Sequence, residues 1–193
     1  MTLFQKMGIQ PGQHVLDIGF RDIAELRAIA GVVGAQGQVI GIDANPNAVR
    51  KATQELAESG ETNIHVQRGS ILAIHAPDNT FDVVLCKGVI HEVRKLEPAF
   101  LEMVRVCKPG GVIAVVDFTP ISLWRFALYF AKATIRMKSL CPDIHPGFSH
   151  EHLQKLLANT GLTELHYEVM DAQWSLGKIT VHPFLLKIQP GQS

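Results

Sequence analysis

The sequence predicts an α/β protein built on a doubly wound, mostly parallel β-sheet with an antiparallel edge. Short apolar runs alternate with helical patterns as far as Phe118, which is typical of parallel strands joined by right-handed crossovers. The runs are apolar at nearly every position, as expected for strands that are buried on both faces. After Phe118 the rhythm changes, and two strand-like stretches joined by a short link favour an antiparallel pair.

The strands can be placed from the apolar runs. Five runs predict the parallel strands, at residues 14–19, 38–43, 63–69, 81–88 and 111–118. The antiparallel pair is predicted at 163–170 and 178–188.

Helix start and stop signals lie between these runs. Asp22 can cap a helix that continues to about Val33 and ends at Gly34. Asn45 stands before Pro46 and opens a second helix, which stops at Gly60. Further helices are predicted at 97–107 and 149–160, and a long segment at 121–140 precedes the last of them.

Composition excludes several classes of protein. The chain has 193 residues, of which 47% are hydrophobic and 19% charged, and its mean hydropathy is +0.14. These values predict one globular domain over residues 1–193. Eighteen basic and eighteen acidic residues leave no net charge, so nothing points to a nucleic acid or an anionic membrane as partner.

Targeting and membrane-spanning patterns are not expected. The first ten residues contain one basic residue and no long apolar stretch, unlike a signal peptide. No uncharged stretch approaches the roughly 18 apolar residues of a membrane span. Cys86, Cys107 and Cys141 are an odd set, and the first two lie in or beside apolar runs. We therefore expect buried free thiols in a reducing compartment, and a cytoplasmic protein.

The ends of the predicted strands are the first place to look for a site. In doubly wound sheets, ligands bind beyond the carboxyl ends of the strands. Asp43 closes the second strand, where a carboxylate can accept two hydrogen bonds from a ribose diol. The alternative is a solvated cap on the next helix.

Four motifs resemble one family. They are V-L-D-I-G at 15–19, I-G-I-D at 40–43, F-D-V-V-L at 81–85 and V-R-V-C-K-P-G-G-V at 104–112. In this order they resemble class I S-adenosylmethionine-dependent methyltransferases, nearest the branch of ubiquinone/menaquinone-biosynthesis C-methyltransferases. Residues 148–162 are similar to the late helix of that branch, and the resemblance covers about residues 7–188. It implies a Rossmann-like, seven-stranded sheet with an antiparallel last strand, and S-adenosylmethionine as cofactor.

The resemblance also implies roles for individual residues. Asp43 would hold the ribose, and Ala44 would pack on the adenine. The remaining residues carried over border the methionine part or the adenine edge of the cofactor. Those at the methionine part are Asp17, Gly19, Lys87 and Gly88, and those at the adenine edge are Ser70 and the backbone N–H of Ile71.

The chain departs from the family in three places. The usual G-x-G-x-G reads G-F-R-D-I at 19–23, so Arg21 and Ile23 bring bulk where a close backbone approach is expected. Ser70 replaces the usual Asp after Gly69. Only residues 1–13 precede the first strand, whereas relatives carry a longer helical segment that closes over the substrate. An open site, a lid supplied by a partner, or a truncated chain would each account for this.

Methyl transfer from a sulfonium needs little from the protein beyond alignment and exclusion of water, which can lower a barrier by ~7–11 kcal/mol. A base is needed only where the acceptor loses a proton. His91 lies just after the fourth strand and has a suitable ordinary pKa of ~6.5, so it is the candidate base. The alternative is a histidine at a helix start that satisfies backbone groups. Glu92 beside it fits a first-turn carboxylate.

Two other clusters have competing interpretations. Cys141, His145 and His150 could hold zinc, but their spacing is unlike that of structural zinc motifs, and a loop with incidental histidines is the alternative. An aromatic cluster at 124–130 is followed by basic residues at 132–138. This segment could form a wall of the acceptor pocket, a basic amphipathic helix that makes peripheral membrane contact through 121–140, or ordinary core packing.

Three functions compete at this stage. The first is an S-adenosylmethionine-dependent methyltransferase that acts on a small, apolar or aromatic acceptor. The second is a catalytically inactive methyltransferase-like binding or scaffold protein, suggested by the altered loop at 19–23. The third, a nucleotide-linked oxidoreductase, is disfavoured because the first turn lacks the glycines that hold a pyrophosphate.

Overall fold

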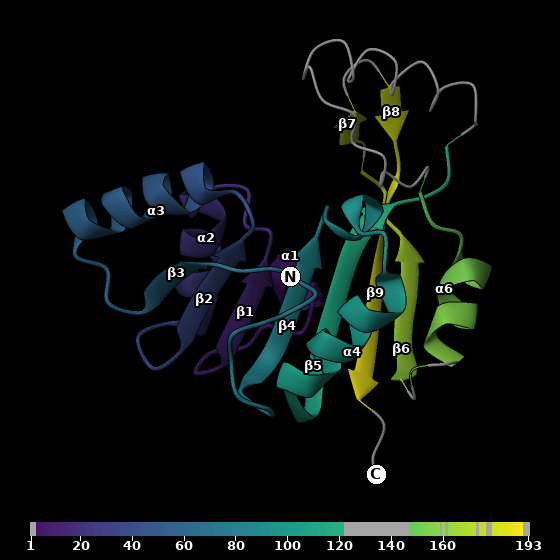
Figure 1. Cartoon of the computed structure of the whole chain (residues 1–193), viewed down its shortest axis with the longest axis horizontal. Coiled ribbons are helices and arrows are strands. Elements are labelled where there is room, and N and C mark those ends of the chain that lie inside the picture. Colours follow the sequence, from purple (N-terminus) through teal and green to yellow (C-terminus); the bar gives the residue numbers. More distant parts are fainter. Residues whose placement is uncertain are drawn as a thin grey trace.

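A seven-stranded sheet with helices on both faces forms the body of the protein (Figure 1). The computed structural model describes residues 3–121, 147–158, 160, 162–172, 174–176 and 179–190. The strand order is β3-β2-β1-β4-β5-β9-β6, and β7 Trp174–Leu176 and β8 Ile179–Val181 form a separate two-stranded sheet. The strands of the sheet are β1 His14–Ile18, β2 Gln38–Asp43, β3 Ile64–Arg68, β4 Phe81–Lys87, β5 Cys107–Phe118, β6 Leu162–Val169 and β9 Pro183–Pro190.

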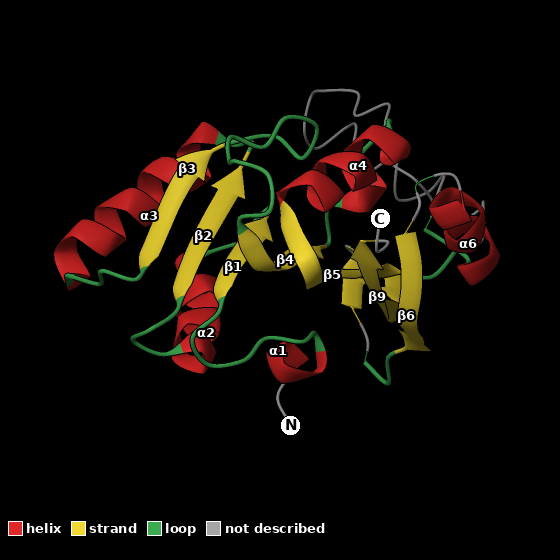
Figure 2. Cartoon of the chain, turned by 90° about the horizontal axis from the view of Figure 1, so that it is seen from below, coloured by secondary structure: helices red, strands yellow, loops and turns green. Residues whose placement is uncertain are grey.

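The helices cover the sheet in two layers (Figure 2). They are α1 Leu3–Lys6, α2 Ile23–Val33, α3 Pro46–Ser59, α4 Leu96–Val106, α6 His150–Ala158 and the short 3₁₀ helix η1 Ile90–Glu92. Apolar residues of α2 and α3 pack with Val15, Val83 and Val116 in one core cluster. Apolar residues of α4 and α6 pack with Leu16 and Val84 in the other. Neighbouring residues of one strand thus enter opposite cores, which explains why the runs are apolar without alternation.

The predicted helix caps are confirmed. The Asp22 side chain accepts a hydrogen bond from the Glu25 N–H at 3.1 Å, and α2 ends at Gly34. Asn45 accepts from the Asn47 N–H at 2.9 Å, and α3 ends at Gly60 in the left-handed region, with φ of 71°. These local signals fix where the two helices that follow β1 and β2 begin and end.

The fifth strand begins earlier than predicted. β5 starts at Cys107, so the K-P-G-G stretch lies within the strand. Its register against β4 shifts between Phe81 and Val83. A Cβ on Gly111 would stand 2.8 Å from the Asp82 carbonyl oxygen, so this irregularity requires glycine.

The last predicted strand is divided in two. β8 Ile179–Val181 pairs with β7 Trp174–Leu176, and β9 begins only after His182. β9 runs antiparallel to both β5 and β6, so the predicted antiparallel pair is confirmed. The antiparallel strand nevertheless lies one position inside the sheet, and β6 forms the edge.

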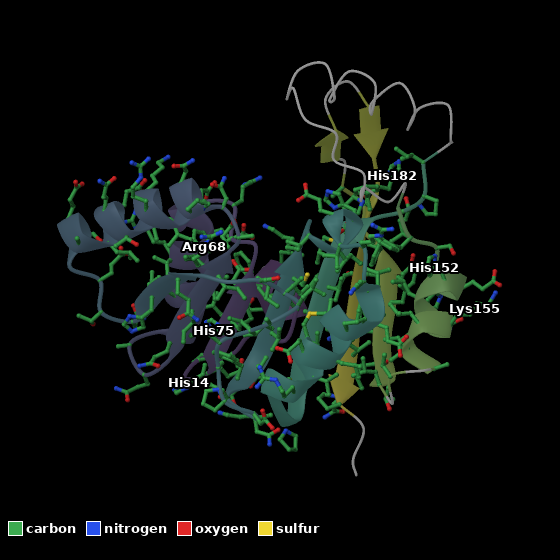
Figure 3. All side chains as sticks on the ribbon, viewed as in Figure 1. His14, Arg68, His75, His152, Lys155 and His182 are labelled. Carbon is green, nitrogen blue, oxygen red and sulfur yellow. The ribbon has the colours of Figure 1, made fainter. Side chains whose placement is uncertain are left out.

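The carboxyl ends of β1, β2, β4 and β5 meet at one edge of the sheet. His14 at the start of β1 lies at the opposite edge, whereas His182, just before the antiparallel β9, lies at the carboxyl edge (Figure 3). The His182 carbonyl accepts hydrogen bonds there from the N–H and hydroxyl of Thr119, which follows β5. None of the described helices is long and apolar enough to span a membrane.

Candidate cofactor site

A cavity of about 460 Å³ opens at the carboxyl ends of β1, β2 and β4. This volume is typical of pockets that hold small molecules and cofactors. β1 pairs with both β2 and β4, which places the cavity at the point where strand order reverses. Six of the predicted cofactor residues line it, namely Gly19, Asp43, Ala44, Ser70, Ile71 and Gly88.

The bulky residues of the loop after β1 point away from this cavity. Phe20 is 1% exposed and packs with Ile23 and Leu26 in the core beneath α2. The Arg21 side chain is 79% exposed and lies 3.4 Å from the Asp22 carboxylate. None of these side chains lines the cavity. The obstruction expected from the missing glycines is therefore absent from this loop.

Gly19 allows a close approach between the ends of β1 and β4. Its φ is +74°, and a Cβ at this position would stand 2.3 Å from a methyl carbon of Val89. The Gly19 N–H donates to the Ile42 carbonyl at 2.7 Å. A larger residue would push the loop after β4 outward, so the one glycine that the motif retains is needed here.

Asp43 occupies the end of β2 on the cavity wall. One carboxylate oxygen, Oδ1, accepts from the Asn45 N–H at 2.7 Å, and the Asp43 carbonyl accepts from the Gly69 N–H at 3.0 Å. The second bond ties the ends of β2 and β3 together, and the first shapes the turn into α3. The carboxylate lines the cavity with one oxygen committed to the backbone.

The loop after β3 is shaped by its own polar groups. The Ser70 hydroxyl accepts from the Leu72 N–H at 3.2 Å, and the Ser70 carbonyl accepts from the Ala73 N–H at 3.0 Å. Ile71 is 7% exposed and joins the core under α4. This turn presents residues 69–72 to the cavity.

Asp17 and Lys87, which were also predicted to border the cofactor, lie in a buried charged cluster next to the cavity and do not line it. The Lys87 ammonium contacts the Glu25 carboxylate. Among the described residues, Oδ2 of Asp17 has no hydrogen-bond partner, although Asp17 is only 1% exposed. Burial, reinforced by the charge of Glu25 and opposed by that of Lys87, raises the pKa of Asp17 to about 8.

His91 lies on η1, outside the cavity lining, and contacts the end of β5. Its Nδ1 stands 3.0 and 3.1 Å from the two carboxylate oxygens of Asp117. Asp117 is completely buried. The expectation that His91 lies just past the fourth strand at the carboxyl edge agrees with this placement.

Some residues of the site were not predicted from the sequence. Glu25 and Asp117 became apparent only from the contacts between elements, although Asp117 closes a predicted strand and strand ends were the expected place for a site. The cavity is also lined by Glu92, the last residue of η1, and by residues 93–95 of the loop before α4. No local pattern marks that loop.

Several predicted features fall outside the described residues. These are the segment at 122–140, with its aromatic cluster, and Cys141 and His145 of the cysteine–histidine group. His150, the third member of that group, is bonded to the Glu164 carboxylate at 2.8 Å and stacks on Tyr167 at 4.0 Å between ring centres.

Comparison with curated proteins gives relatives of known activity. A demethylmenaquinone methyltransferase from Desulfitobacterium hafniense is 28% identical over 180 residues, covering 85% of this chain and 71% of that protein. A sterol 24-C-methyltransferase from Yarrowia lipolytica is 30% identical over 174 residues, covering 86% of this chain. The chain spans only 43% of the length of that second relative, and about half of several other demethylmenaquinone methyltransferases.

Solved structures share the fold. A SAM-dependent methyltransferase from Aquifex aeolicus superimposes with a TM-score of 0.69 at 22% identity, covering 96% of this chain and 86% of that one. One from Methanosarcina mazei gives a TM-score of 0.76 at 18% identity, covering 100% and 99%.

Family comparison assigns residues 9–164 to the methyltransferase domain. This stretch contains β1 to β5 and the whole cavity lining described above. Together with the curated relatives, the match favours a methyltransferase over a nucleotide-linked oxidoreductase. The chain belongs to the methyltransferase domain family, as a class I S-adenosylmethionine-dependent methyltransferase related to the ubiquinone/menaquinone-biosynthesis C-methyltransferases.

Proposed function

We propose that this protein transfers a methyl group from S-adenosylmethionine to a small, apolar or aromatic acceptor of the quinol or sterol type. The observation that carries the proposal is the cavity at the ends of β1, β2 and β4, with the Asp43 carboxylate on its wall. The two acceptor classes are those named for the curated relatives.

The adenosine half of the cofactor fits the β2–β3 side of the cavity. Asp43 is the only carboxylate at the end of β2, and its second oxygen can accept from the ribose hydroxyls. Ala44 and Ile71 offer apolar surface to the adenine, and Ser70 offers a polar group at its edge. Each of these residues lines the same cavity.

The methionine half fits the β1–β4 side. Gly19 and Gly88 line the cavity at the ends of β1 and β4, and both have positive φ. Oδ2 of the buried Asp17, which lacks a hydrogen-bond partner among the described residues, can accept a hydrogen bond from an ammonium group. Beside it, the positive charge of Lys87 pairs with the negative charge of Glu25.

The bound cofactor supplies an electrophilic methyl group. The protein then has to hold the acceptor in line with that group and keep water out, as the cavity walls can do. Positioning of this kind requires no metal and no nucleophilic side chain.

The location of the protein is part of the proposal. Cys86 and Cys107 are free and buried, which fits a reducing compartment such as the cytoplasm. The acceptor itself would be a small molecule, and no nucleic acid partner is implied by the balanced charge.

Calorimetric titration with S-adenosylmethionine and its demethylated product tests the proposal. Binding should weaken about tenfold to a hundredfold in Asp43→Asn, which keeps an acceptor for the Asn45 N–H but removes the charge that holds a diol. Glu151→Ala is the matched control, because this carboxylate is 76% exposed on α6 and, within the described part of the chain, pairs only with Lys155.

The two parts of the proposal can fail separately. Absence of binding to the folded protein at millimolar cofactor would overturn the methyl-donor assignment. The acceptor class is checked by mass spectrometry of products formed from a short-chain demethylmenaquinol and from a sterol. Transfer to neither, in a protein that binds the cofactor, would overturn the acceptor assignment.

A further inference from the structure

Asp117 is a buried carboxylate that the cofactor site does not explain. It is 0% exposed at the end of β5, and it does not line the cavity. The register between β4 and β5 pairs Lys87 with Val116, so the residues that follow the two strands emerge side by side. Burial of a carboxylate costs free energy unless hydrogen-bond donors replace the lost water. The described residues around Asp117 supply such donors.

Most of these hydrogen bonds come from His91. Its backbone N–H donates to Oδ2 of Asp117 at 3.2 Å, and its ring Nδ1 lies 3.0 and 3.1 Å from the two carboxylate oxygens. The N–H of Phe118 donates to Oδ1 at 2.9 Å. An ionised carboxylate can only accept, so Nδ1 of His91 carries the hydrogen. The other ring nitrogen, Nε2, is then the one that gains or loses a proton.

The surroundings fix the ring and place Nε2 beside Glu92, a neighbour on the same 3₁₀ helix. The His91 ring packs on Phe118, with 4.9 Å between ring centres, and its side chain is 13% exposed. Nε2 lies 3.7 Å from a carboxylate oxygen of Glu92, a residue that lines the cavity. The ring is therefore held at Nδ1 by Asp117, while Nε2 lies next to a residue that lines the cavity.

The charges around the ring raise the proton affinity of His91. Burial lowers its pKa, but the hydrogen bond and charge of Asp117, with a contribution from Glu92, outweigh burial and raise the pKa above its usual value. Cys86, also close to Asp117, stays a neutral thiol because burial and the nearby carboxylates raise its pKa. A histidine held in this way is suited to accept a proton near neutral pH.

We infer that Asp117 is a positioning residue that orients His91, so that Nε2 takes a proton from the acceptor as that acceptor is methylated. This inference rests on the proposed methyl transfer. A bond forms between the acceptor atom and the methyl carbon while the bond from that carbon to sulfur breaks, and the sulfur keeps the electron pair and becomes neutral. The proton that leaves the acceptor passes to Nε2 and later to water.

The orientation can be tested without cofactor or acceptor, by NMR titration of the His91 ring. In the wild type we expect the pKa to lie above ~6.5 and Nδ1 to carry the hydrogen in the neutral form. In Asp117→Asn we expect the pKa to fall by about one unit or more. Asp82→Asn is the matched control, because that carboxylate pairs with Lys108 at the opposite end of β4.

Catalysis is tested by the pH dependence of turnover with a short-chain demethylmenaquinol. Asp117→Asn should lower kcat at least tenfold and move its acid limb to lower pH, with little change in cofactor affinity. His91→Gln should lower kcat by about 10²–10⁴-fold and remove the limb. If Asp117→Asn does not fold, His91→Gln still tests whether His91 accepts the proton.

Two results would overturn the inference. One is an unchanged His91 pKa in folded Asp117→Asn, and the other is an acid limb that persists in His91→Gln. Because the NMR titration needs neither ligand, it judges the pairing of Asp117 and His91 separately from cofactor binding. Failure of the wild type to bind S-adenosylmethionine would contradict the proposed function alone.

Discussion

Two buried aspartates at the carboxyl edge of the sheet differ in their hydrogen-bond partners. Asp117 accepts three hydrogen bonds from backbone and ring N–H groups, which suit its ionised form. Asp17 is equally buried but has one oxygen without a partner among the described residues, and Glu25 stands nearby. Burial at Asp117 is thus accompanied by donors to both oxygens, whereas burial at Asp17 leaves one oxygen without a donor and favours the neutral form of that side chain.

This difference predicts a pH dependence of stability. The pKa of Asp17 is about 8 in the folded chain and ~3.8 in the unfolded chain, so between these values the native state binds a proton that the unfolded state has lost. The free energy of unfolding should fall as the pH rises from about 4 to 8. An amide is neutral at every pH, so in Asp17→Asn folding no longer requires the uptake of this proton. The substitution should therefore stabilise the protein by about 1 kcal/mol or more at pH 8, with no gain near pH 4.

Urea denaturation of both proteins across this pH range measures the difference. Asp171→Asn is the control, because Asp171 is exposed beyond β6, and its stability difference from the wild type should not vary with pH in the same way. A stability gain in Asp17→Asn that is equal at pH 4 and pH 8 would contradict the assignment of the raised pKa to Asp17.

At the scale of elements, α4 holds the cavity loop that follows β3. Arg105 donates to the carbonyls of Ile74 and Ala76, each at 2.8 Å, and to the Asp78 carboxylate at 2.8 Å. Glu102, one helical turn earlier, accepts from the Ile74 N–H at 2.9 Å and from Arg105. A single helix face thereby satisfies the backbone of a loop that has little regular structure of its own.

Arg105→Ala should therefore loosen this loop. Two carbonyls and two carboxylates lose their partner, and we expect a loss of about 2 kcal/mol in the free energy of unfolding. Amide hydrogen exchange at residues 74–78 should accelerate more than in β1. Arg50→Ala is the control, since the hydrogen bond that the structure gives Arg50 among the described residues is to the exposed Asn47 side chain on α3. Unaltered exchange at 74–78 would show that the loop holds its shape without α4.

At the scale of the whole molecule, the sequence predicted what depends on local signals. Helix caps such as Asp22 and Asn45 act within a few residues, and both lie where expected. Most strand runs also lie where expected, whereas the fifth strand begins earlier and the last is divided in two. The pairing of His91 with Asp117 depends on the register of β4 against β5, which no local pattern encodes. The same holds for Lys87 and Glu25, which come from different elements.

The direction of the side chains in the loop after β1 could not be predicted from the sequence either. The missing glycines suggested that bulk would enter the cofactor site. Gly19 has a positive φ, and the chain after it sends Phe20 into the core and Arg21 into solvent. Direction after such a turn depends on the core that receives the side chain, so bulk alone did not predict obstruction.

The strand β9, inserted between β5 and β6, couples the two hydrophobic cores. Leu185 enters the core under α2 and α3, and Leu186 enters the core under α4 and α6. Their partners on β5 are Val116 and Val115. Because adjacent residues of one strand serve both cores, neither core can lose its packing while the central strands stay intact. We therefore expect the chain to unfold as a single domain.

Leu185→Ala and Leu186→Ala test this expectation from the two faces. Each leucine is at most 1% exposed, so each change should destabilise the protein by about 2–5 kcal/mol through the cavity that it leaves. Calorimetry and far-UV circular dichroism should record one transition in both variants, shifted to lower temperature. If Leu185→Ala instead produced a separate early transition that Leu186→Ala did not, the α2 layer would be melting on its own. That result would replace one cooperative domain with two.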